Sequence, residues 1–304
     1  MICKDFSFNG KNLSDFYCST FDPDTEQTFP ARESIHGELT AVRTSPSYYG
    51  TKYSDNLTLN FLIRKDTERF SELSEMHDGS NSKYFSQQEL RDIRAWLEST
   101  SLPSPLITYG DDGYIDDVQY FGFFKDVQPD LMSSYYCIGL KLVFECSSPN
   151  GYSDLETVSA DVLATETTKS ITINNTSDVQ DKYIYPTINI YVDNTKSPKG
   201  TITIKNVSDN NNSVKLSIID DTIIKIDCEK NMIEKSDGSI ISIGDLGLDL
   251  NSVFDYNNSS AYVCNLYWPR LVYGNNEIQF LMDTQGVVTK VEVSARFVRK
   301  VDGM

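Results

Sequence analysis

The chain has 304 residues and a formal net charge of −17, with 39% hydrophobic and 12% aromatic residues. This length allows two ordinary domains, and the hydrophobic content is sufficient for two packed cores. No stretch approaches 18 consecutive apolar residues, and the N-terminus lacks the features of a secretion signal, so we expect a protein that folds in a cytoplasm without a membrane span. Residues 1–152 hold 13 Lys and Arg against 23 Asp and Glu. The acidity argues against nucleic-acid binding, because no basic stripe is present to neutralise phosphates.

Alternating apolar residues and one helical segment predict a mainly β N-terminal domain. Every second residue from Leu57 to Ile63 is apolar, and the same period recurs from Leu140 to Cys146, so both segments are expected to be half-buried strands. Between them, Ser86 and Glu89 form a capping box at the start of a helix that reaches Leu97. The Ser-Ser-Pro-Asn-Gly sequence after the second strand predicts a turn.

The next segments predict a domain boundary and a second β domain. Residues 153–169 are rich in Ser, Thr, Asp and Glu and have few apolar residues, so we expect a linker there. A period of two then returns in six segments, at 188–192, 202–204, 214–218, 224–228, 278–282 and 291–297. This pattern is typical of antiparallel sandwiches. The expected organisation is an N-terminal domain over 1–152, a linker over 153–169 and a C-terminal domain over 170–304.

The chemistry-bearing residues point to neither an enzyme nor a cofactor protein. The chain has two histidines, His36 and His77, and no P-loop, G-x-S-x-G or H-E-x-x-H motif. We therefore expect no enzymatic activity and no cofactor. The best metal candidate is a cluster of four carboxylates, Asp111, Asp112, Asp116 and Asp117. The spacing lacks the closing glutamate of a calcium loop, so a solvated hairpin tip is the favoured interpretation.

Two further groups of residues invite a functional interpretation. The six cysteines (Cys3, Cys18, Cys137, Cys146, Cys228 and Cys264) show no CxxC motif, and we expect reduced, mostly buried thiols. In the C-terminal half, Tyr267 and Trp268 are candidates for stacking on a sugar ring. Aromatic residues of a sandwich belong more often to its core or rim, which is the alternative interpretation.

Five segments, in order along the chain, carry a family resemblance. They are Phe6–Gly10, the S-x-x-E-x-x-x-I-x-x-W-L segment Ser86–Leu97, the G-x-x-L-x-F-x-C-x-S-P segment Gly139–Pro149, Tyr185–Ile190 and Leu271–Ile278. Their order and spacing over nearly the whole chain resemble the distal tail proteins of long-tailed, siphovirus-type bacteriophages.

The resemblance implies an all-β protein with two parts. The first is an N-terminal β-sandwich or barrel-like ring domain with one helix, and the second is a C-terminal galectin-like β-sandwich. It also implies a structural hub of the phage tail tip or baseplate: a homo-hexameric ring that joins the tail tube to the tail-tip hub and lets DNA pass. The implied partners are the tail-tube protein, the tail-tip hub protein and a receptor-binding protein, and the implied location is the virion. The alternative is a carbohydrate-binding host-adsorption module acting through the C-terminal sandwich.

A ring requires an interface between copies, and the N-terminal half is expected to supply it. Edge strands present unpaired backbone groups to which a neighbouring subunit can add a strand or arm. The segment Arg43–Asn56 is our candidate for that arm, because aromatic residues are enriched in interface cores. Its tyrosines are Tyr48, Tyr49 and Tyr53.

Overall fold

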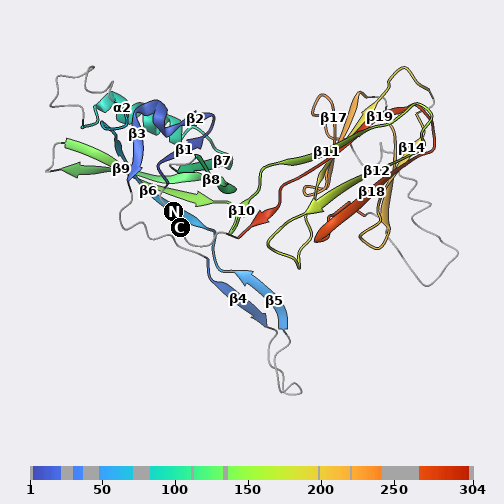
Figure 1. Cartoon of the computed structure of the whole chain (residues 1–304), viewed down its shortest axis with the longest axis horizontal. Coiled ribbons are helices and arrows are strands. Elements are labelled where there is room, and N and C mark those ends of the chain that lie inside the picture. The colour runs from blue at the N-terminus through green and yellow to red at the C-terminus, as the bar shows by residue number, and fades with distance from the viewer. Residues whose placement is uncertain are drawn as a thin grey trace, which may run out of the picture. The chain divides into compact units, whose positions relative to one another are not determined.

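A computed structural model describes residues 3–21, 30–36, 48–70, 83–110, 113–132, 136–197, 199–219, 221–241 and 267–300. The chain divides into two compact units, Met1–Ser153 together with Arg299–Met304, and Asp154–Val298. Each unit has a hydrophobic core of its own. Strands dominate both units (Figure 1), which confirms the all-β fold class. Within the described residues, no helix has the length and apolar character needed to cross a lipid bilayer.

The N-terminal unit is built on one antiparallel sheet with the strand order β2-β1-β7-β8-β9-β6-β3. Its strands are β1 (Asp5–Phe8), β2 (Lys11–Asn12), β3 (Cys18–Phe21), β6 (Thr58–Lys65), β7 (Ser104–Gly110), β8 (Gly113–Met132) and β9 (Tyr136–Cys146), with β10 (Gly151–Tyr152) and β20 (Val298–Arg299) branching from it. A short 3-10 helix, η1 (Leu13–Phe16), precedes β3. The Thr20 N–H donates to the Lys4 carbonyl at 3.0 Å, so β3 returns to the chain entering β1. This return gives the unit a barrel-like arrangement.

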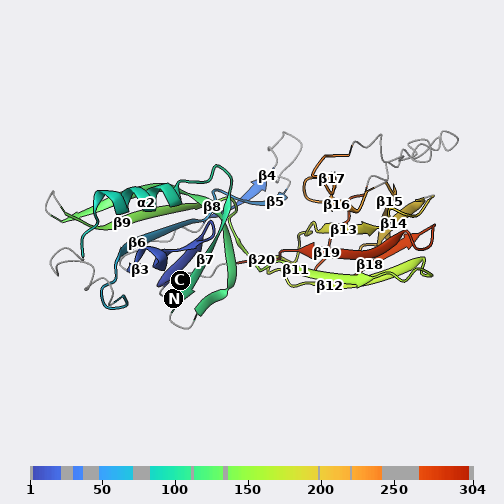
Figure 2. The same cartoon turned by 90° about the horizontal axis from the view of Figure 1, so that it is seen from above.

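The helix α2 (Gln87–Leu97) covers the core of this unit, as Figure 2 shows from a second direction. Its Ile93, Trp96 and Leu97 are buried, and the Trp96 indole N–H donates to the Phe8 carbonyl at 2.8 Å. The Trp96 ring also stacks on Phe16, with ring centroids 4.8 Å apart. The predicted strand at Leu140–Cys146 is the second half of β9, and its alternate apolar residues are buried as expected.

A buried lysine ties the start of α2 to the sheet. The Lys65 side chain at the end of β6 is 2% exposed, and its Nζ lies 2.6 Å from Glu89 Oε1. Glu89 Oε2 accepts the Ser86 N–H at 2.7 Å, and Ser86 Oγ accepts the Glu89 N–H at 3.3 Å, which confirms the predicted capping box. Burial alone would raise the pKa of Glu89, but the hydrogen bonds from Lys65 and Ser86 hold that pKa below its ordinary value. One carboxylate therefore caps the helix and balances a buried charge.

The C-terminal unit is a sandwich of two antiparallel sheets over one shared core. The five-stranded sheet has the order β11-β19-β13-β16-β17, with β11 (Glu156–Asp161), β13 (Thr187–Val192), β16 (Ile223–Asp227), β17 (Met232–Lys235) and β19 (Val288–Ala295). The four-stranded sheet has the order β12-β18-β14-β15, with β12 (Thr168–Asn175), β14 (Thr201–Asn206), β15 (Asn212–Ser217) and β18 (Gly274–Met282). In both sheets the apolar residues of the predicted alternation point into the core, for example Ile188, Ile204 and Phe280, each 0% exposed.

The prediction of a linker over residues 153–169 is wrong. Residues Glu156–Asp161 form β11, which pairs with β19 along its whole length, and β12 begins at Thr168. The strand was missed because β11 lies at the edge of its sheet and its side chains are mostly exposed or half-buried, which removes the apolar alternation from the sequence. The second unit also ends before residue 304, since β20 pairs with β10 in the N-terminal unit.

Replacing Glu89 with alanine is expected to lower the free energy of unfolding of the N-terminal unit by about 2 to 3 kcal/mol, because α2 loses a capping contact and the Lys65 ammonium loses its partner. Urea denaturation followed by Trp96 fluorescence in a Trp268→Phe background measures this unit separately. The matched control is Gln88→Ala in the same helical turn, which should stay within about 0.5 kcal/mol of the parent. The double variant Lys65→Met/Glu89→Gln should lose less stability than Glu89→Ala, since no buried charge is left unpaired. Equal losses for Gln88→Ala and Glu89→Ala would contradict the coupling.

Candidate functional site

A two-stranded hairpin stands apart from the nine-stranded sheet of the N-terminal unit (Figure 1). Its strands are β4 (Arg32–His36) and β5 (Tyr48–Tyr53), and they pair only with each other among the described strands. All five residues of β4 are exposed. A lone two-stranded hairpin is at best marginally stable in water, because it has no core on either face. We call this hairpin the arm.

The arm displays the tyrosines that the sequence singled out. Tyr48 is 62% exposed and Tyr49 is 66% exposed, while Tyr53 is half-buried at the base. The register shifts between Ile35 and His36, which leaves Tyr49 as an extra residue in a bulge. Gly50 follows it with a φ of +113°, a conformation that other residues rarely adopt. Residues 43–47 of the predicted arm segment lie outside the described residues.

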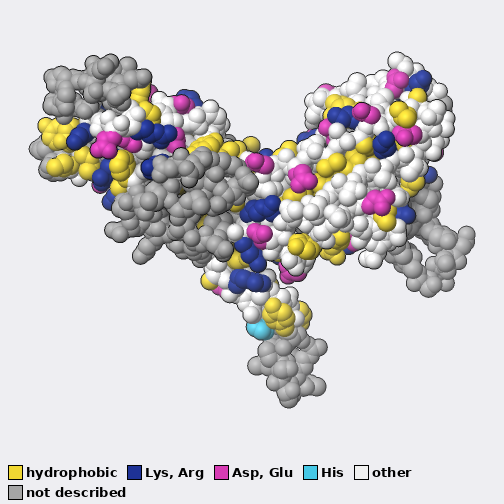
Figure 3. Space-filling model, in the orientation of Figure 1, with side chains coloured by type: hydrophobic (Ala, Val, Ile, Leu, Met, Phe, Trp, Pro, Cys, Tyr) yellow, Lys and Arg dark blue, Asp and Glu magenta, His cyan; other side chains and the backbone are white. Residues whose placement is uncertain are grey.

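Polar and aromatic side chains share one face of the arm. The Arg32 Nη2 donates to Thr51 Oγ1 at 2.8 Å, and the rings of His36 and Tyr48 have centroids 5.7 Å apart. The space-filling view in Figure 3 shows hydrophobic side chains next to this histidine. Aromatic and arginine side chains of this kind are typical of protein interfaces.

The structure leaves the predicted metal cluster largely undescribed. Asp111 and Asp112 lie outside the described residues, and Asp116 and Asp117 belong to β8 with side chains that are not described. Gly110 pairs with Gly113, so the two aspartates between them connect β7 to β8. Among the side chains that the structure describes, no three His, Cys, Asp or Glu residues are grouped to hold a metal ion. His77 also lies outside the described residues.

The described cysteines are free thiols, and four of them are buried: Cys18, Cys137, Cys146 and Cys228. Burial raises the pKa of Cys18 to about 12 and that of Cys146 to about 12, because a thiolate is poorly solvated in an apolar core. These thiols are therefore inert core residues at neutral pH. Cys264 lies outside the described residues.

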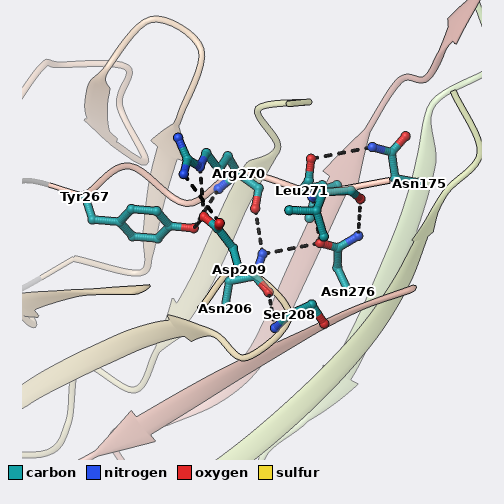
Figure 4. A network of polar contacts seen from close by, with 9 residues as sticks. Asn175, Asn206, Ser208, Asp209, Tyr267, Arg270, Leu271 and Asn276 are labelled. Carbon is teal, nitrogen blue, oxygen red and sulfur yellow. Dashed lines mark hydrogen bonds and ion pairs between the residues drawn. The ribbon is translucent and has the colours of Figure 1, made fainter. Parts of the chain in front are cut away.

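The C-terminal unit contains a connected polar network around a buried carboxylate, shown in Figure 4. The Asp209 side chain is 3% exposed, and its Oδ2 accepts Arg270 Nε at 2.8 Å and the Tyr267 hydroxyl at 2.9 Å. Arg270 Nη2 lies 3.4 Å from Asp209 Oδ1, so the guanidinium engages both carboxylate oxygens. The network joins the turn after β14 to the segment 267–271.

Asparagine side chains extend this network along the same segment. The Asn206 amide donates to the Arg270 carbonyl at 2.6 Å and to Asn276 Oδ1 at 3.3 Å. Asn276 in turn accepts the Val272 N–H at 2.9 Å and donates to the Val272 carbonyl at 2.8 Å. Asn206 and Asn276 are both 0% exposed, so these bonds satisfy side-chain amides that water cannot reach.

Burial would raise the pKa of Asp209, but the hydrogen bonds from Arg270 and Tyr267 outweigh it and hold that pKa below its ordinary value. The pKa of Tyr267 is raised, first by burial and then by its hydrogen bond to the Asp209 carboxylate. Tyr267 is therefore a fixed donor inside the network. Trp268 packs against the hydrophobic core, which matches the core interpretation offered for these aromatics.

The sequence did not identify Asp209 and Arg270 as partners. They are 61 positions apart, and the three asparagines that follow Asp209 in the sequence are typical of a loop. No sequence signal marks this contact, because the burial of Asp209, which calls for a cationic or hydrogen-bonding partner, exists only in the folded chain.

Residues 1–148 match the family model described as the phage tail protein N-terminal domain. This part of the chain is similar to the phage tail protein N-terminal domain, and we call it the tail domain. No curated protein sequence matches the chain. The tail domain supplies the sheet, α2 and the arm described above.

Two solved structures align with nearly the whole chain. The Dit protein of phage SPP1, described as a paradigm of the hub adsorption apparatus in phages that infect Gram-positive bacteria, aligns with a TM-score of 0.57 and 12% identity over 98% of this chain and 100% of its own. A chain of the phage p2 baseplate aligns with a TM-score of 0.47 and 10% identity over 100% of both chains. At 12% identity the SPP1 alignment shows a shared fold. The resemblance to distal tail proteins is confirmed by the match of residues 1–148 to a phage tail domain and by the fold shared with SPP1 Dit.

Substituting Asp209 with asparagine should destabilise the C-terminal unit by about 2 kcal/mol at pH 7, because the network loses a charge-assisted partner. A carboxylate with a lowered folded-state pKa contributes stability above its unfolded pKa and loses it as the pH falls through the folded value. The difference between wild type and Asp209→Asn should therefore shrink below about pH 4. Scanning calorimetry from pH 7 to pH 3 measures it, with Asp161→Asn on the exposed face of β11 as the matched control. A difference that does not change with pH would contradict the assigned role of the carboxylate.

Alkylation of the unfolded protein without reductant should label all six cysteines, since the described thiols are unpaired. In the native protein at pH 7, Cys18, Cys146 and Cys228 should stay unlabelled for as long as the units remain folded. Mass spectrometry of the labelled peptides distinguishes the two conditions. One reproducible internal disulfide would overturn the prediction.

Proposed function

We propose that this protein is the structural hub of a phage tail tip, in which six copies form a ring between the tail tube and the tail-tip hub. The ring holds the host-adsorption apparatus and leaves a lumen through which DNA passes. The tail domain at residues 1–148 and the fold shared with SPP1 Dit, a protein described as a hub, support this role. The protein acts as a structural part and not as an enzyme, and it assembles in the cytoplasm of the bacterial host.

The arm is the observation that carries the proposal. Its strands have no sheet partner other than each other in the described part of the chain, and its exposed side chains include Ile35, Tyr48 and Tyr49. A hairpin with two open faces gains its stability by packing against another molecule. A second copy is that molecule, since an arm reaching from each subunit to the next makes a head-to-tail contact that closes into a ring.

The base of the arm is anchored well enough to transmit such a contact. The Ser54 N–H donates to the Ala31 carbonyl at 2.9 Å, where the two strands meet the tail domain. Leu57 then enters the core at 0% exposure, and its carbonyl accepts the Cys146 N–H at 2.9 Å. A rigid base lowers the entropy lost when the arm docks on a neighbour.

The charge of the chain suits a ring that DNA traverses. Each copy carries −17, and we expect carboxylates to outnumber Lys and Arg on the wall of the lumen. A basic wall would hold the phosphate backbone by releasing counterions, and an acidic wall avoids this. The partners that the resemblance to distal tail proteins implies are the tail-tube protein, the tail-tip hub protein and a receptor-binding protein.

Native mass spectrometry of the full chain should give six times 34.4 kDa, about 206 kDa. The double variant Tyr48→Ala/Tyr49→Ala should weaken the contact between neighbouring copies by at least about tenfold, because it removes exposed aromatic anchors. The matched control is Tyr273→Ala, an exposed tyrosine of the other unit, which should leave the ring intact. A wild-type monomer at high protein concentration would refute the ring, and a double variant as hexameric as wild type would refute the arm as its interface.

A further inference from the structure

Two exposed tyrosines of the C-terminal unit, Tyr183 and Tyr185, lie two positions apart in the chain, and the ring of Tyr183 contacts Arg270 of the buried network. Ile184 and Leu271 form an isolated antiparallel bridge, with N–H to carbonyl distances of 3.1 and 2.7 Å. Leu271 is 0% exposed and Ile184 packs against the core. Their neighbours therefore point the other way, which brings Tyr183, Tyr185 and Arg270 to the outer side. Tyr183 is 45% exposed and Tyr185 is 43% exposed.

The arginine of this surface is fixed on two sides. Its guanidinium carbon lies 3.7 Å from the centroid of the Tyr183 ring, and its Nε and Nη2 bind the Asp209 carboxylate. Nη1 has no partner in the described part of the chain, and the side chain is 29% exposed. The remaining N–H donors are thus presented to solvent in one orientation, and a ligand that accepts them loses little arginine entropy on binding.

The charge balance decides which ligand fits. Asp209 neutralises the Arg270 guanidinium, and the chain around it carries a formal net charge of −17. An anionic ligand gains little attraction from a paired arginine and is repelled by the rest of the protein. A neutral ligand with hydroxyl oxygens accepts the free N–H groups without that penalty, and its apolar C–H face packs on an exposed tyrosine ring.

We propose that Tyr183, Tyr185 and Arg270 form a binding site for a neutral pyranose sugar. Tyr185 offers the stacking face, Arg270 donates to the sugar hydroxyls, and Tyr183 supports the guanidinium from below. Tyr267 acts through Asp209 as a positioning residue. In this proposal Tyr185 and Arg270 contact the sugar, and Tyr267 does not. A shallow site of this size binds weakly, with a dissociation constant on the order of 1 mM. The proposal concerns the C-terminal unit alone and stands whether or not the ring forms.

The test is saturation-transfer NMR with the full-length chain and five neutral sugars: glucose, galactose, rhamnose, N-acetylglucosamine and N-acetylgalactosamine. At least one sugar should receive saturation from the wild-type protein. Tyr185→Ala should weaken that binding by at least about tenfold, because the stacking face is lost, whereas Tyr185→Phe should retain it. Arg270→Lys should also weaken binding, since lysine cannot keep both the Asp209 contact and the free donors.

The matched control is Tyr136→Ala, a tyrosine of the N-terminal unit that is 52% exposed and should leave sugar binding unchanged. Chemical-shift spectra of each variant confirm that the unit is folded. Absence of saturation transfer to every sugar overturns the proposal, and so does transfer that is equal in wild type and Tyr185→Ala. Binding of inorganic phosphate in place of the sugars overturns the neutral ligand class. If the protein is monomeric and binds sugar through Tyr185, the ring proposal is refuted and the sugar site is supported.

Discussion

The contact between Lys65 and Glu89 connects the two halves of the tail domain. Lys65 ends β6, which lies between β9 and β3 in the sheet, and its ammonium is removed from water. Such a charge persists only when a partner of opposite sign is held next to it. Glu89 is held by the capping box of α2, so the position of the helix and the burial of the lysine depend on each other. The stacking of Trp96 over Phe16 and its bond to Phe8 follow from where this contact puts the helix.

The position of the arm depends on the same strand, β6. β6 runs from Thr58 to Lys65, with the ion pair at its end and the buried Leu57 just before its start. β5, which carries Tyr48 and Tyr49, comes before β6 in the chain and is joined to it through residues 54–57. A docking element needs a base bonded to its own domain and exposed side chains beyond that base, because fewer residues then lose entropy on binding. The C-terminal unit uses a similar device, in which the buried Asp209 holds Arg270 against the ring of the exposed Tyr183.

The parts of the fold that local patterns encode were predicted from the sequence. The alternation in β9 and the capping box of α2 each depend on residues within a few positions of one another, and both were identified correctly. β11 was missed because an edge strand exposes most of its side chains and so shows no apolar alternation. The interface role of the arm tyrosines stays a prediction, and the pairing of β4 with β5 was not predicted, since neither strand has a buried face. The Asp209–Arg270 contact is a product of tertiary folding, and no local pattern connects residues so far apart.

We propose that the arm of each copy is completed by its neighbour, and electron cryo-microscopy of the protein as it assembles in solution can show whether this is so. We expect six copies in a closed ring, with each arm ordered against the adjacent tail domain and with Tyr48 and Tyr49 buried in that contact. A ring in which the arms remain exposed to solvent, or arms that fold back on their own tail domain, would contradict it.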